Sequence, residues 1–200
     1  MNIKTLFETK KNEPSDINEH LPVLYRLAER VNTITEFGTR HGDSTTAFLA
    51  ATENTNKKVV SYDLYKSPII DFFTTQPNFT FHQSDTLSIS IEQTDLLFID
   101  TLHTYHQLYN ELVKHNSNVS TYIVLHDTTS YGEIDEPLYD INSDVKMSHL
   151  SEKTEKTGLK NAISDFLKTE QGQNWFIGQT FENNNGLTIL KRITKTLFEV

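Results

Sequence analysis

Acidic residues stand at or beside the ends of most apolar runs in this chain: Glu36, Asp63, Asp85, Asp100 and Asp127. A single acid after a strand commonly caps the next helix, so none of them alone indicates a site. The carboxyl ends of parallel strands, however, share one edge of a sheet. Five acids gathered there would repel one another unless a cation or a hydrogen-bonding ligand lay between them. The repeated pattern therefore predicts a ligand-binding edge.

Two histidines accompany the last two of these acids. His103 follows Asp100 by three residues, and His126 directly precedes Asp127. Oxygen and imidazole ligands suit Mg²⁺ or Mn²⁺, so we predict a metal site at Asp100, His126 and Asp127, with His103 nearby. The alternative is a metal-free site in which His103, with an ordinary pKa of roughly 6.5, is a general base oriented by Asp100 or Asp127. Four histidines outside this pattern are expected at the surface: His20, His82, His115 and His149.

Apolar runs alternate with helical patterns along the chain, and this alternation indicates an α/β fold. The run at 94–100 is apolar without a break, which is typical of a strand buried on both faces of a parallel sheet. An Asn/Gly turn at 183–186 predicts a hairpin. We therefore expect an open, mostly parallel seven-stranded sheet with helices on both faces and a C-terminal antiparallel hairpin. Strands are expected at 33–37, 58–64, 78–85, 94–100, 120–127, 174–181 and 187–193, and helices at 16–30, 44–54, 67–76, 103–116 and 159–170.

One domain is expected over residues 1–200. Residues 1–14 are mostly polar and are predicted to form a loosely held N-terminal arm that could serve a homodimer. Residues 128–157 are polar, weakly periodic and long for a loop in a compact domain. We predict that this insertion is a lid over the substrate, with Tyr131 and Tyr139 beside the site.

Two of the seven glycines, Gly38 and Gly42, lie between the first expected strand and the next helix. Gly38 would allow a sharp turn, and Gly42 would let a ligand approach that helix, whose predicted N-cap is Ser44. The Gly-x-Gly-x-x-Gly pattern of dinucleotide-binding loops and the P-loop lysine are both missing. Asp63 ends the next strand, where a carboxylate would accept hydrogen bonds from ribose hydroxyls, and Asp85 follows where an adenine edge would lie.

Five motifs follow one another along the chain: EFGTRHGDSTTAFLA, SYDL, HQSD, DLLFIDTLHTYHQLYNEL and YIVLHDT. Over roughly residues 17–193 the chain resembles the class I S-adenosylmethionine-dependent methyltransferases. More narrowly, it resembles small-molecule or sugar O-methyltransferases whose fourth strand ends in a FIDGxHxY-like motif. The resemblance implies a Rossmann-like fold, S-adenosylmethionine as cofactor and methyl transfer to a hydroxyl of a small acceptor, a sugar being one candidate. The resemblance is also compatible with a bound Mg²⁺ or Mn²⁺ ion that assists the methyl transfer.

The resemblance also implies roles for individual residues. Asp63 corresponds to the ribose-binding acid, Asp100 to the acid facing the sulfonium, and His103 to the histidine of an Asp-x-x-His-x-Tyr segment. Arg40-His41 departs from the common motif, being bulkier and more basic, and Thr101-Leu102 replaces the usual glycine followed by Asp, Asn or Ser. The implied cofactor residues are Glu36, Gly38, Thr39, Gly42, Ser44, Asp63, Ser84, Asp85 and Asp100, and the implied catalytic residues are Asp100, His103 and Asp127.

Composition excludes several other classes. The 18 basic residues against 27 acidic ones give a net charge of −9, which disfavours binding to nucleic acid. Cysteine is absent, so disulfides, thiolate metal sites and cysteine nucleophiles are excluded. No segment approaches the ~18 apolar residues of a membrane span, and a soluble cytoplasmic protein is expected. Two alternatives stay open: a non-catalytic protein that keeps the cofactor-binding sheet and, less favoured by the motifs, an NAD-dependent reductase.

Overall fold

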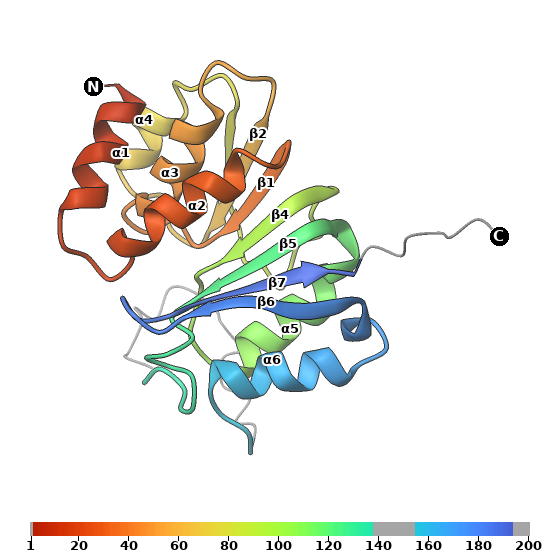
Figure 1. The fold of residues 1–200 in the computed structure, drawn as a ribbon. Coiled ribbons are helices and arrows are strands. Elements are labelled where there is room, and N and C mark those ends of the chain that lie inside the picture. The colour runs from red at the N-terminus through yellow and green to blue at the C-terminus, as the bar shows by residue number, and fades with distance from the viewer. Residues whose placement is uncertain (1, 138–154, 194–200) are drawn as a thin grey trace.

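The computed structural model describes residues 2–137 and 155–193. Seven strands form one sheet in the order β3-β2-β1-β4-β5-β7-β6, in which β7 is antiparallel to both of its neighbours, β5 and β6, and all other pairs are parallel (Figure 1). The predicted fold class is therefore confirmed. The strands are β1 (Thr33–Phe37), β2 (Lys58–Asp63), β3 (Phe79–Gln83), β4 (Thr94–Ile99), β5 (Val119–His126), β6 (Trp175–Phe181) and β7 (Leu187–Arg192). The α-helices are α1 (Ile3–Asn12), α2 (Leu21–Ala28), α3 (Asp43–Thr52), α4 (Ile69–Phe73), α5 (Tyr105–His115) and α6 (Leu159–Lys168).

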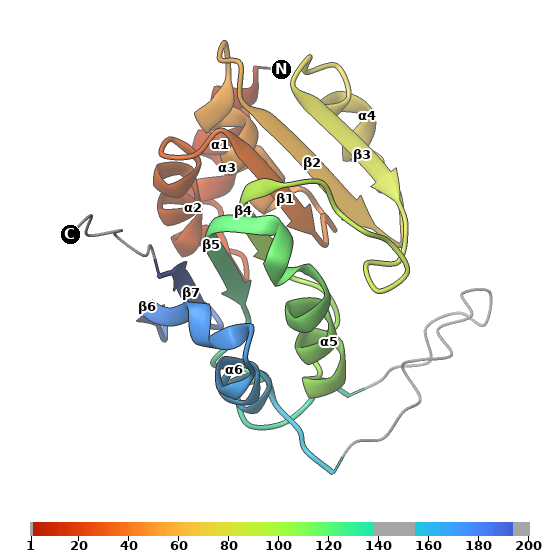
Figure 2. The same ribbon diagram turned by 90° about the vertical axis from the view of Figure 1, so that its right-hand side faces the viewer.

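The helices cover the two faces of the sheet as separate groups. Helices α1 to α4 pack on one face, and α5 and α6 pack on the other (Figures 1 and 2). Strand β4 serves both cores, because successive side chains of a strand point to opposite faces. Leu96 and Phe98 belong to the core beneath α1–α4, and Leu97 and Ile99 to the core beneath α5 and α6. This explains why the run at 94–100 is apolar throughout.

The N-terminal segment is a packed helix, so the prediction of a loosely held arm is wrong. Helix α1 is capped by Asn2, whose side chain accepts a hydrogen bond from the Lys4 backbone N–H at 2.8 Å. Ile3, Leu6 and Phe7 are buried in the core shared with α3. They form a narrow apolar stripe at helical spacing, which the surrounding lysines and glutamates obscure in the sequence.

The turn from β1 into α3 depends on two glycines with left-handed backbone angles. Gly38 has φ +85°, and a Cβ there would lie 2.0 Å from the carbonyl oxygen of Asp100. Gly42 has φ +73°, and a Cβ there would lie 2.4 Å from the ring of Phe73 in α4. Gly38 thus allows β1 to turn tightly against the end of β4. The space beside Gly42 is taken by protein packing, which differs from the ligand approach expected there.

Helix α3 begins one residue earlier than predicted. Gly42 occupies the N-cap position and Asp43 begins the helix, so the expectation that Ser44 is the N-cap is wrong. The Ser44 hydroxyl is instead buried and donates to the Glu36 carboxylate at 2.6 Å. None of the helices in the described ranges is long and apolar enough to cross a membrane.

Candidate functional site

A cavity of about 520 Å³ lies at the carboxyl ends of the parallel strands. Its volume is in the range of small-molecule sites, and strand ends are where open α/β sheets bind ligands. Every parallel strand contributes lining residues from the turn that follows it. The lining residues that the sequence had singled out are Gly38, Asp63, Ser84, Asp85, Asp100, His103 and Asp127.

Five of the predicted site residues do not line this cavity: Glu36, Thr39, Gly42, Ser44 and His126. Glu36 is fully buried below the β1–α3 turn and accepts hydrogen bonds from the hydroxyls of Ser44, Thr45 and Ser61. Burial raises the pKa of Glu36 to about 7, and the three hydroxyl donors act in the opposite direction. Glu36 therefore supports the turn from beneath, and a direct contact with a cofactor stays a prediction.

Asp63 holds the same turn from the side of β2. Its Oδ2 accepts from the Thr39 backbone N–H at 2.7 Å, the Thr39 hydroxyl at 2.9 Å and the Arg40 backbone N–H at 3.0 Å. Its Oδ1 accepts from the Tyr65 backbone N–H at 2.9 Å. Because Asp63 also lines the cavity, one carboxylate both fixes the turn and faces the position predicted for the ribose.

Ser84 and Asp85 follow β3 at the far end of the cavity. The Ser84 backbone N–H donates to the Asp63 carbonyl at 2.9 Å, and Asp85 Oδ1 accepts from the Leu87 backbone N–H at 2.9 Å. Both residues line the cavity at the end predicted for the adenine.

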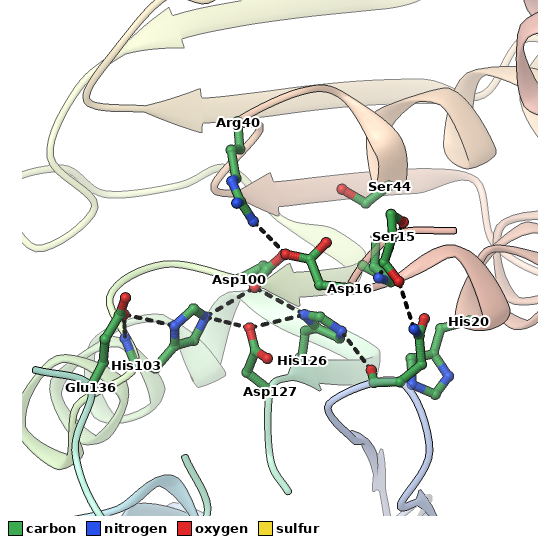
Figure 3. A network of polar contacts seen from close by, with 12 residues as sticks. Ser15, Asp16, His20, Arg40, Ser44, Asp100, His103, His126, Asp127 and Glu136 are labelled. Carbon is green, nitrogen blue, oxygen red and sulfur yellow. Dashed lines mark hydrogen bonds and ion pairs between the residues drawn. The ribbon is translucent and has the colours of Figure 1, made fainter. Parts of the chain in front are cut away.

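The ends of β4 and β5 bring Asp100, His103, His126 and Asp127 into one cluster (Figure 3). Ile99 and Leu125 pair in the parallel register, so the residues that follow them lie side by side. His103 Nε2 lies 2.9 Å from Asp127 Oδ2 and 3.2 Å from Asp100 Oδ1. His126 Nδ1 lies 3.2 Å from each of the same two oxygens. The predicted catalytic group is therefore brought together in space.

Glu136 joins this cluster, and the sequence had not singled it out. Its Oε2 lies 2.8 Å from His103 Nδ1, and its backbone N–H donates to the His103 carbonyl at 2.9 Å. Tyr131 stacks on the His103 ring with the centroids 5.0 Å apart, and it lines the cavity as predicted from its place in the insertion. Several acids precede Pro137, and no spacing marks Glu136 among them. Residues 138–154 of the predicted lid, Tyr139 included, lie outside the described residues.

The neighbouring carboxylates, three at His103 and two at His126, favour the protonated form of both histidines. Burial by itself would lower the pKa of His103, but hydrogen bonds to Asp100, Asp127 and Glu136 raise it to about 12. Burial is likewise outweighed at His126, where Asp100 and Asp127 raise the pKa to about 10. Conversely, the two histidines lower the pKa of Asp127 to about 2 against the effect of burial. The expectation that His103 has an ordinary pKa near neutrality is therefore wrong for this arrangement.

These shifts predict that stability falls as the pH rises. A histidine whose pKa is raised by folding stabilises the protein below its unfolded pKa, and this contribution is lost as the pH approaches the folded value. For metal-free protein in EDTA, we expect the free energy of unfolding to fall between pH 7 and 9.5, by up to ~1.4 kcal/mol per pH unit for each histidine. Urea unfolding at a series of pH values measures this directly. His126→Gln should give a shallower slope, and an equal slope in both proteins would contradict the assignment.

A divalent cation could bind between the two strand ends. The ligand atoms of Asp100, His103 and Asp127 lie within 4.8 Å of one another. Asp127 Oδ1 is buried and has no hydrogen-bond partner among the residues that the structure describes, so it can accept a further ligand. Two carboxylates and an imidazole suit Mg²⁺ or Mn²⁺. This group contains His103 where the sequence predicted His126, whose role as a ligand stays a prediction.

The surface prediction is wrong for two of the remaining histidines. His20 and His115 are each only 1 % exposed, and their Nε2 atoms bond to the carbonyls of Asn183 at 3.0 Å and Thr86 at 2.9 Å. Glu19, His20, Asn183, Asn184 and His126 form a junction beside the cluster. In it, the Glu19 backbone N–H donates to the Asn184 side chain at 3.0 Å, and His126 Nε2 lies 3.3 Å from the Asn184 carbonyl. The β6–β7 turn therefore connects the N-terminal segment to the cluster, whereas His149 lies outside the described residues.

The fold is similar to that of several solved methyltransferase structures. A Staphylococcus aureus protein assigned as a caffeoyl-CoA O-methyltransferase is 13% identical, with 96% of this chain and 93% of that chain covered and a TM-score of 0.63. The methyltransferase PaMTH1 of Podospora anserina, bound to S-adenosylhomocysteine, is 12% identical over 96% of this chain and 88% of that chain, with a TM-score of 0.61. The N-methyltransferase NodS of Bradyrhizobium japonicum is 13% identical over 90% of this chain and 97% of that chain, with a TM-score of 0.58.

The fold is that of the class I S-adenosylmethionine-dependent methyltransferases, as the order of the sequence motifs predicted. Residues 35–128, which run from within β1 to just after β5 and include Asp63, Asp85, Asp100, His103 and Asp127 of the cavity, match the family model described as a methyltransferase domain. No curated protein matches the chain. Because both O- and N-methyltransferases share this fold, the fold alone does not define the acceptor atom.

Proposed function

We propose that the chain is an S-adenosylmethionine-dependent methyltransferase that methylates a hydroxyl oxygen of a small molecule, with a sugar as one candidate. The observation that supports this most directly is a single cavity with two chemically different ends. Asp63 and Asp85 provide carboxylates at the nucleoside end, and Asp100, His103 and Asp127 form the cluster at the other. The net charge of −9 also favours a small acceptor over nucleic acid.

Methyl transfer from a sulfonium is an in-line displacement, so the protein must chiefly orient the two reactants. The carbon–sulfur bond breaks, a carbon–oxygen bond forms, and the acceptor hydroxyl loses its proton. In the structure, both ring nitrogens of His103 bond to carboxylates, which leaves its imidazolium no lone pair for that proton. Asp127 has a free oxygen, but with a pKa of about 2 it is a weak base.

We therefore favour metal assistance over histidine assistance. Asp100 and Asp127, together with His103 after loss of its proton, are the residues that would hold Mg²⁺ or Mn²⁺. Such an ion would orient the acceptor hydroxyl and lower its pKa, which removes the need for a strong protein base. Tyr131, stacked on His103, would then form one wall of the acceptor site.

The test is a thermal melt with S-adenosylhomocysteine or NAD, each in Mg²⁺, Mn²⁺ or EDTA. S-Adenosylhomocysteine at ~100 times its Kd should raise the Tm by roughly 5–10 °C, and NAD should not. A further rise with Mg²⁺ or Mn²⁺ would support the cation site. No rise with saturating S-adenosylhomocysteine would contradict the proposed function, and a rise with NAD alone would favour a reductase.

Binding alone does not separate an enzyme from a non-catalytic protein of the same fold. Transfer of a labelled methyl group to members of a panel of hydroxylated and amino acceptors makes that distinction. Labelled product from hydroxyl acceptors is the expected result. Product from amino acceptors only would move the assignment from O- to N-methyl transfer.

A further inference from the structure

The charges lining the cavity are strongly unequal. Six carboxylates line it: Asp16, Asp63, Asp85, Asp100, Asp127 and Glu136. Among the lining residues of the described chain, Arg40 is the only lysine or arginine. The other cationic group, His103, is already enclosed by Asp100, Asp127 and Glu136. A ligand that carries a carboxylate would therefore find one available cation in this cavity.

Arg40 lies at the turn after β1, between the two ends of the cavity. Its backbone N–H donates to Asp63, the acid predicted to face the ribose. Its side chain reaches across to the segment between α1 and α2, where the guanidinium pairs with Asp16, near Asp100 (Figure 3). Its φ is +40°, a left-handed value that is uncommon for a residue other than glycine, and the bonds from Asp63 to this turn hold it there.

The ion pair between Arg40 and Asp16 is readily exchanged. The side chains of Arg40 and Asp16 are 70% and 36% exposed, and ion pairs between exposed side chains contribute little stability. A planar guanidinium also binds a carboxylate through two parallel hydrogen bonds, so the carboxylate of a ligand can replace that of Asp16 without loss of geometry.

We propose that Arg40 binds the carboxylate of the methionine part of S-adenosylmethionine, and that this carboxylate replaces Asp16 as its partner. This inference rests on the proposed function. The cofactor has one carboxylate, and a ribose at Asp63 with a sulfonium near Asp100 places its amino-acid end beside the turn that carries Arg40. Asp16 then neutralises Arg40 while the cofactor is absent. Arg40 thereby selects the complete cofactor over nucleosides that lack the amino-acid end.

Two ligands test this in one experiment: S-adenosylhomocysteine, which has the carboxylate, and 5′-methylthioadenosine, which lacks the whole amino-acid end. Calorimetric Kd values are measured for the wild type, Arg40→Gln, Asp16→Asn and Arg30→Gln. Arg30 is exposed after α2, near the opposite ends of the strands, and its substitution makes the same change of charge. In Arg40→Gln we expect about a tenfold or greater loss of affinity for S-adenosylhomocysteine and less than about a twofold change for 5′-methylthioadenosine. Arg30→Gln should bind both ligands like the wild type.

Three results would overturn the proposal. An unchanged affinity of Arg40→Gln for S-adenosylhomocysteine would show that Arg40 does not bind the cofactor and would leave it for an anionic group of the acceptor. An equal loss for both ligands would mean that Arg40 only organises the turn. The same loss in Asp16→Asn as in Arg40→Gln would assign the effect to the ion pair itself. A wild type that binds neither nucleoside would instead contradict the proposed function.

Discussion

Asp127→Asn is expected to lower kcat by about 100-fold or more and to leave the Kd for S-adenosylhomocysteine nearly unchanged. Asp127 is 5% exposed and contacts both His103 and His126, and within the described ranges its Oδ1 is a buried carboxylate oxygen without a hydrogen-bond partner. In the proposed function this carboxylate has a role whether the cluster binds a cation or acts through protein groups alone, so its loss should slow the reaction in either case. Initial rates with a labelled donor and an accepted substrate measure the effect.

Asparagine is the matched replacement, because Asp127 has φ +58° and asparagine tolerates that left-handed conformation. The variant should therefore fold, which a thermal melt checks, and any loss of activity can be assigned to the charge. If metal assistance is correct, the residual rate should no longer respond to Mg²⁺ or Mn²⁺. A kcat within about twofold of the wild type would remove Asp127 from the mechanism.

Asp63→Ala is expected to weaken binding of S-adenosylhomocysteine by ~1–3 kcal/mol. The substitution removes the carboxylate predicted to face the ribose and leaves the amides of Thr39 and Arg40 without their acceptor. Both effects act on the cofactor end of the cavity, so kcat at saturating cofactor should change less than the Kd. Calorimetric titration measures the difference.

Asp95→Ala is the matched control for this variant. Asp95 also accepts backbone N–H groups, from Asn32 at 2.8 Å and Thr33 at 3.2 Å, but at the opposite ends of the strands. It should destabilise the protein by a comparable amount without changing affinity for the cofactor. Equal losses of affinity in the two variants would show that Asp63 acts only through general stability.

The sequence predicted most of the fold because strand and helix positions depend on local hydrophobic periodicity. All seven strands lie within about two residues of their expected bounds, and the Asn/Gly turn forms the hairpin. Helix α1 was missed as a packed element because its three buried residues are outnumbered by polar ones. The burial of His20 and His115 was missed for a different reason. Each is satisfied by a carbonyl far away in the chain, which no local pattern reveals.

Part of the candidate site could also be predicted from the sequence. The carboxyl ends of parallel strands lie side by side, so the acids that follow β4 and β5, Asp100 and Asp127, were expected to lie close together, as they do. The state of His103 could not be predicted, because its pKa depends on three carboxylates of which one, Glu136, comes from an irregular segment. The burial of Glu36 could not be predicted either, because its carboxylate is enclosed by hydroxyls from α3 and β2, and its contact with a cofactor stays a prediction.

Because the β6–β7 turn lies near the end of the chain, we expect the two halves of the cavity to form at different times during synthesis on the ribosome. The turn between β1 and α3 is contacted by Lys10, Asp16 and Asp63. All three residues lie in the first third of the chain and are therefore synthesised early. The cluster at the ends of β4 and β5 can be completed only after the last two strands have been synthesised, because β7 pairs with β5 and the Asn184 carbonyl contacts His126. We therefore expect a nascent chain to complete the turn held by Asp63 well before the cluster of Asp100, His103, His126 and Asp127. If the proposed function is correct, the cofactor would bind the early half of the cavity and stabilise it while the rest of the domain is still being synthesised.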